Sequence, residues 1–144
     1  MAFVDWYPGY TVNNEQMDRD HQALFRAIND LREGTLEGRP EESLQKSFHF
    51  LRNYVITHLE VEEKMLLEIG YPEFPEHKAA HEQLLHQMRI HEKLFNEGKK
   101  REAADLLSFL LKTWLVSHIL SMDRAYGKFL ATHRIGVSET KPSR

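Results

Sequence analysis

The chain contains no cysteine, which excludes disulfide bonds, thiolate metal sites and iron–sulfur clusters. Glycine and proline are few, seven and five in 144 residues, so there are few breaks between regular elements. No basic run is present and the net charge is −3, which gives no reason to expect a nucleic acid or membrane partner. No apolar run approaches membrane-span length, and no signal peptide pattern opens the chain. We therefore expect a cytoplasmic protein.

Apolar residues recur at steps of three and four over four segments, near 14–37, 40–70, 74–98 and 99–133. The breaks between the segments are short, so neighbouring helices should run antiparallel. The pattern predicts an all-α fold, an up-down-up-down four-helix bundle. We expect one domain over residues 1–136, including an aromatic N-terminal arm at 1–13, and a polar tail at 137–144.

Nine histidines are present, and several lie on the predicted core face. An unpaired polar group in an apolar core costs several kcal/mol. One such histidine would ordinarily be hydrogen-bonded, but six polar residues share these core positions. They are His21, His58, Glu62, His77, His81 and His118.

One histidine from each helix falls at the same height in the predicted bundle. In an antiparallel hairpin, residues equidistant from the turn lie side by side. His21 and His58 are equidistant from the first break, about 18 residues or roughly 27 Å away. By the same measure, His58 matches His81 across the second break, and His81 matches His118 across the third.

Local spacing agrees with a shared site. The pairs His58–Glu62 and His77–His81 have i, i+4 spacing, so each pair shares one helix face. Asp123 follows His118 by five residues, which leaves them about 140° apart on an ideal helix. Periodicity alone therefore leaves open whether Asp123 enters the site.

The sequence resembles the hemerythrin family, specifically its bacterial single-domain members, over nearly its whole length. The matching pieces are the Trp6 arm with Tyr10, the segment Met17–His21, the segment His58–Glu63 with Met65, the segment Gly70–Pro72 with His77 and His81, and the segment Trp114–Ile119 with Asp123. By this resemblance, His77, His81 and His118 are terminal ligands of a first iron. His21 and His58 are those of a second, and Glu62 and Asp123 bridge the two.

The resemblance implies two non-haem irons (Fe2+/Fe3+) joined by an oxo or hydroxo bridge. Six positions are then filled on the first iron and five on the second, which leaves one position for O2. The implied function is reversible O2 binding for transport, storage or delivery, with no catalytic residues. We expect a monomer, and an O2-consuming enzyme could receive the O2 that it releases. The expected apolar wall over the open position is Leu24, Leu59, Trp114, Leu115 and Ile119.

Two other functions stay open: an O2-sensing module that acts through a partner, and a diiron oxidase or peroxidase. The oxidase and ferritin class uses Glu-x-x-His motifs, and none is present. Of the other histidines, we expect His49, His86 and His133 to be solvated. We expect His91 to pair with Asp105 near the third break.

Overall fold

A computed structural model describes residues 3–133, and within that range it is helical with no strand. The α-helices are α1 (Glu15–Leu36), α2 (Glu41–Glu68), α3 (Phe74–Asn96), α4 (Lys100–His118) and α5 (Arg124–His133). Two short elements complete the set, a 3-10 turn η1 (Pro8–Tyr10) and a π-helical turn η2 (Ile119–Asp123). The sequence-predicted tail at 137–144 lies outside the described residues.

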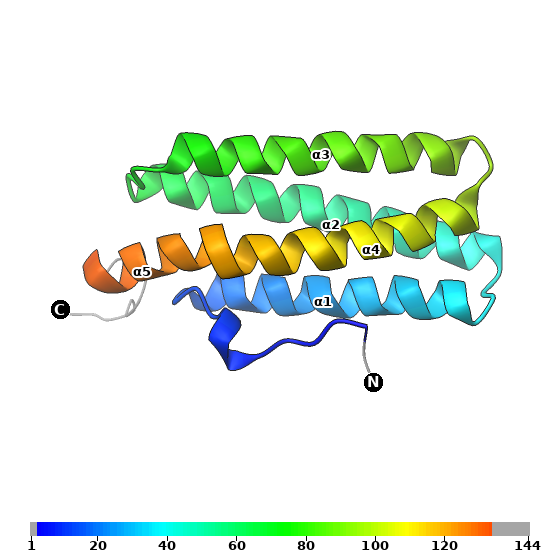
Figure 1. Cartoon of the computed structure of the whole chain (residues 1–144), viewed down its shortest axis with the longest axis horizontal. Helices are drawn as coiled ribbons and strands as arrows, with labels where there is room; N and C mark the ends of the chain where they lie inside the picture. Colours follow the sequence, from blue (N-terminus) through cyan, green and yellow to red (C-terminus); the bar gives the residue numbers. More distant parts are fainter. Residues whose placement is uncertain (1–2, 134–144) are drawn as a thin grey trace.

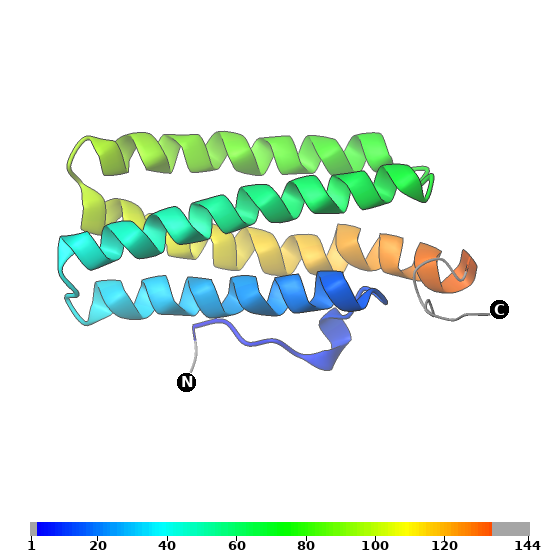
Figure 2. The same ribbon diagram turned by 180° about the vertical axis from the view of Figure 1, so that it is seen from behind.

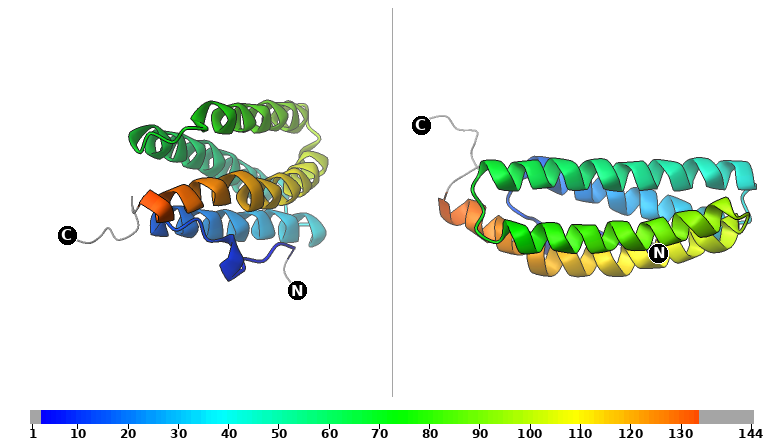
Figure 3. Two further views of the ribbon diagram at one scale, coloured as in Figure 1. Left: turned by 60° about the vertical axis from the view of Figure 1, so that its left-hand side comes forward. Right: turned by 90° about the horizontal axis from the view of Figure 1, so that it is seen from above.

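The helices form four antiparallel rods, because α4, η2 and α5 continue one another without a break (Figure 1). The views from behind and from above show the same side-by-side arrangement (Figure 2, Figure 3). The sequence-predicted up-down-up-down bundle is therefore confirmed.

Local signals in the sequence set the helix ends. The Asn14 side chain caps α1 by accepting a hydrogen bond from the Met17 backbone N–H at 3.0 Å. Gly38 and Gly70 follow α1 and α2 with φ of +70° and +67°, a conformation in which glycine carries no steric penalty.

The core consists of two apolar clusters along the bundle, and polar residues lie between them. The larger cluster includes Leu24, Leu59 and Leu115. The smaller one, at the other end, includes Met17 and Tyr126. The four histidines that the sequence predicts at one height fall in the gap between these clusters.

The rod from Lys100 to His133 is long and apolar enough to cross a membrane by length and composition alone. This differs from the expectation that no segment reaches that length. The rod supplies Leu107, Leu111 and Leu115 to the bundle core, and it also carries buried His118 and Asp123. Packing inside the bundle therefore accounts for part of its apolar character, while Leu106, Phe109 and Leu120 of the same rod are exposed.

The N-terminal arm is hydrogen-bonded to the bundle near both of its ends. The Asn29 side chain exchanges two hydrogen bonds with the Val4 backbone, at 2.9 and 2.8 Å. Farther along, Asn13 donates to the carbonyl of Gly127 at 3.0 Å. A Cβ on Gly127 would lie 2.8 Å from the Val12 backbone, so this crossing requires glycine.

Candidate metal centre

The seven ligand candidates from the sequence come together at one level of the bundle, and all are buried. They are His21 from α1, His58 and Glu62 from α2, His77 and His81 from α3, His118 from α4 and Asp123 from η2. Each of the four rods contributes at least one. The donor atoms of the five histidines and Glu62 fall into two groups that share Glu62.

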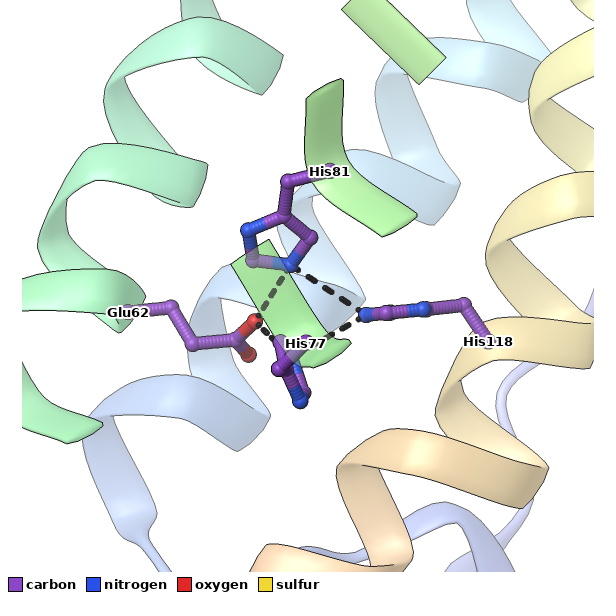
Figure 4. A group of neighbouring side chains, drawn as sticks. All are labelled: Glu62, His77, His81 and His118. Atoms are coloured by element: carbon purple, nitrogen blue, oxygen red, sulfur yellow. Dashed lines mark hydrogen bonds and ion pairs between the residues drawn. The ribbon is translucent and has the colours of Figure 1, made fainter. Parts of the chain in front are cut away.

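The first group contains three histidines around one carboxylate oxygen (Figure 4). Glu62 Oε1 lies 3.0 Å from Nε2 of both His77 and His81. His118 Nε2 lies 3.2 Å from each of those two nitrogens. Three imidazole nitrogens and one oxygen therefore point at a common position, which suits a metal ion that accepts nitrogen and oxygen ligands.

The second group contains two histidines and the other oxygen of Glu62. Glu62 Oε2 lies 3.8 Å from the Nε2 atoms of His21 and His58. Asp123 spans the same two groups: its Oδ1 is 3.1 Å from His77 and 2.9 Å from His118, and its Oδ2 is 3.2 Å from His21. Both acids thus present one oxygen to each histidine group.

The π-helical turn η2 brings Asp123 onto the same side as His118. The backbone N–H of Arg124 donates to the carbonyl of Ile119, five residues back rather than four. This wider turn places residues five apart nearly above one another, and such π turns occur often at functional sites. It removes the separation of about 140° that an ideal helix would impose.

The same turn shifts the buried stripe of α5 by one residue. Continuing the α-helical period through Met122 predicts Ala125 and Phe129 inward. In the structure Tyr126 and Leu130 are fully buried, while Ala125 is exposed. The sequence analysis therefore missed Tyr126, whose hydroxyl donates to Glu62 Oε2 at 2.7 Å.

Several buried polar atoms in the site have no hydrogen-bond partner of acceptable geometry among the described residues. They include both ring nitrogens of His21 and Oδ1 of Asp123. Buried polar atoms are seldom left unsatisfied unless an ion or another group is to be bound. The donor set and these orphaned atoms therefore fit a pair of metal ions.

Charge in the site favours the ionised acids. Burial alone would raise the pKa of both carboxyls, but the facing histidines hold the pKa of Glu62 and of Asp123 well below its usual range. For His77, burial lowers the pKa, but hydrogen bonds and charge from Asp123 and Glu62 outweigh it and raise the pKa to about 9. A cationic metal would take the place of these protons, because ligating histidine must be neutral.

Two further acids orient ligand histidines from behind. Asp20 Oδ2 lies 3.1 Å from Nδ1 of His58, and Glu63 Oε2 lies 2.9 Å from Nδ1 of His81. Each contact favours a proton on Nδ1, which leaves Nε2 free as the donor atom. The sequence carries little signal for these roles. Asp20 adjoins His21 in the chain and Glu63 adjoins Glu62, so neither acid is next to the histidine that it contacts.

The five residues of the expected apolar wall are placed unequally. Leu24, Leu59, Leu115 and Ile119 are buried in the larger cluster. We expected Trp114 to cover the site with two histidines, but its ring stacks on His118 at 4.2 Å, beside the site with three. Trp6 of the arm lies beside His21 instead, with ring centroids 6.4 Å apart.

The remaining histidines lie away from the centre. His86 and His133 are exposed, and His49 is half-buried with its ring 5.6 Å from that of Phe95. The expected pair of His91 with Asp105 does not form. His91 Nδ1 contacts the Gln87 carbonyl at 2.7 Å, and Asp105 instead pairs with Arg32 of α1, whose longer side chain spans the two helices.

Comparison with known proteins gives one consistent family. Residues 12–130 match the family described as the hemerythrin HHE cation binding domain. A bacteriohemerythrin of Methylococcus capsulatus is 30% identical over 91% of this chain and 99% of its own length. A bacteriohemerythrin of Stenotrophomonas maltophilia is 25% identical over 92% and 85%. The crystal structure of a wild-type hemerythrin is 27% identical with a TM-score of 0.79, and the match covers 90% of this chain and 99% of that one.

Proposed function

The chain belongs to the hemerythrin family of non-haem iron, O2-binding proteins, and we propose that it binds O2 reversibly for storage, transport or delivery at a centre of two irons. The ligands would be the seven residues that the sequence analysis names. His77, His81 and His118 would hold one iron, and His21 and His58 the other. Glu62 and Asp123 would each bind both.

One observation carries this proposal: each of the two acids directs one oxygen to each histidine group. Glu62 does so with Oε1 and Oε2, and Asp123 with Oδ1 and Oδ2. A carboxylate that served a single ion would have no reason to divide its oxygens in this way. When bound, two ferrous ions would supply the electron pair that O2 takes up and returns on release.

The unequal donor count favours binding of O2 at one side only. The side with His77, His81 and His118 has five donor atoms when both acids are included, and the side with His21 and His58 has four. The side with fewer donors has room for a small ligand. The buried leucines Leu24, Leu59 and Leu115 would keep water from it and so limit irreversible oxidation.

The decisive experiment tests reversibility. The purified protein, loaded with iron and reduced under argon, should gain an absorbance band when O2 is admitted. Sweeping with argon should return the original spectrum. If the original spectrum does not return, and the protein instead consumes O2 repeatedly in the presence of a reductant, a diiron oxidase or peroxidase would be favoured. The site's five histidines and two acids argue against that class, which is richer in carboxylates.

A further inference from the structure

A groove of about 390 Å³ opens on the surface between α1 and α2, and His58 forms part of its wall. The other lining residues are Gln16, Asp20, Phe50, Asn53, Tyr54, Thr57 and Val61. Asp20 is the only carboxylate among the lining residues, and no lysine or arginine lines the groove. The groove therefore has a negative charge at its inner end.

Asp20 connects this groove to the candidate metal centre. Its side chain is 14% exposed, so solvent reaches it, and its Oδ2 is 3.1 Å from His58 Nδ1. On the other side of the same ring, His58 Nε2 faces Glu62. One imidazole thus separates a solvent-accessible carboxylate from the buried donor atoms.

Two other approaches to the ligand histidines differ in charge. Glu63 contacts His81 in the same way, but the ammonium of Lys78 lies 3.3 Å from Glu63 and offsets its charge. Beside His118 there is an opening of about 570 Å³, and His118 is its only ionisable lining residue. Among these approaches, only the groove at Asp20 presents a carboxylate with no cationic side chain paired to it.

We propose that the groove between α1 and α2 is the path by which divalent cations enter the centre. This inference rests on the proposed function, because it requires that the centre binds metal. The charge of Asp20 would attract a hydrated cation, and the carboxylate could replace water in its coordination shell. The ion would pass inward when Asp20 exchanges its contact with His58 for a contact with the ion.

The test uses the rate at which the metal-free full chain takes up Co²⁺. Stopped-flow tryptophan fluorescence would follow uptake, because Trp114 stacks on His118 and should be quenched as the centre fills. Asn53→Lys places a positive charge in the groove at an exposed residue that is not a candidate ligand. Gln87→Lys is the matched control, because Gln87 is also exposed but lines a different groove, beside Trp114.

We expect Asn53→Lys to slow uptake by about fivefold at low ionic strength, and by less than about twofold in 0.5 M salt, where surface charge is screened. Gln87→Lys should change the rate little, and Asn53→Asp should raise it. Both lysine variants should bind as much Co²⁺ at equilibrium as the wild type. If Asn53→Lys unfolds by circular dichroism, Thr57→Lys tests the same groove.

An unchanged uptake rate in Asn53→Lys would overturn the entry path, as would equal slowing by Gln87→Lys. Failure of the wild-type chain to bind Co²⁺ at all would instead reject the proposed metal centre. The two failures are therefore distinguishable in one set of measurements.

Discussion

His118 and Asp123 are five residues apart in the chain, yet His118 Nε2 lies 2.9 Å from Asp123 Oδ1. The π-helical turn between them makes this contact possible, because its wider turn removes the angular offset of an α-helix. Without it, the second acid would leave the centre, and Glu62 would be the only carboxylate shared by both histidine groups. The local backbone therefore sets the composition of the site.

Removal of Glu62 should empty the centre. In Glu62→Ala, both histidine groups lose a shared oxygen, so we expect iron content below about half that of the wild type. Elemental analysis of protein purified from iron-rich medium measures this. Glu60→Ala, on the exposed face of the same helix, is the matched control.

The histidines outside the centre provide a second control. The triple variant of His49, His86 and His133 to Gln should retain normal iron content and the O2-dependent absorbance band. Loss of that band would show that the metal ligands are assigned incorrectly.

The two orienting acids should act on different metal positions. We expect Asp20→Asn to weaken binding at the side with His58, and Glu63→Gln at the side with His81, each by about tenfold to a hundredfold. A two-step titration of the metal-free protein with Co²⁺ separates the two effects. Equal losses at both steps in either variant would contradict the assignment.

The stability of the metal-free protein should fall at alkaline pH. The folded protein holds the pKa of His77 at about 9, above its ordinary value of 6.5, so folding favours the protonated ring. The resulting stabilisation is fully present below pH 6.5 and is lost as pH rises through about 9. Urea unfolding at pH 6 to 10 measures this.

The iron-loaded protein should behave in the opposite way, because metal binding requires neutral histidines. Its stability should rise as the solution becomes less acidic. If the unfolding free energy depends on pH in the same way in both forms, His77 does not exchange a proton for metal.

The crossing of the arm over α5 should not tolerate a side chain at Gly127. In Gly127→Ala, the new Cβ would lie 2.8 Å from the Val12 backbone, so the arm must shift. We expect a loss of about 1–3 kcal/mol of unfolding free energy, as for other overpacked sites. Gly9→Ala is the control, because a Cβ there meets nothing within 4 Å.

The apolar wall should protect the oxygenated protein. Leu115 is 4% exposed, and Leu115→Asn would bring a polar group into the wall. We expect iron loading to persist and autoxidation to accelerate about tenfold, equivalent to about 1.4 kcal/mol in the barrier. Decay of the O2-dependent band at fixed pH measures the rate. An unchanged rate would mean that Leu115 serves packing alone.

The sequence was sufficient to predict the bundle and the meeting of most of the candidate ligands at one level of it. Equal distances from the breaks placed His21, His58, His81 and His118 at one height, because an antiparallel hairpin has a constant rise per residue. The i, i+4 spacing then added Glu62 and His77. Both arguments depend only on regular helix geometry, which the sequence pattern specifies.

The features that depart from that regularity follow from the tertiary structure, and among them only Asp123 was indicated by the sequence, through the family resemblance. The π turn moved Asp123 inward and advanced the buried stripe of α5 to Tyr126, and no periodic rule predicts an extra residue in a helix. Packing between helices likewise decided that Asp20 would orient His58 and that Trp114 would stack on His118. These contacts depend on how the rods are rotated against one another, and side-chain packing across the whole bundle sets that rotation.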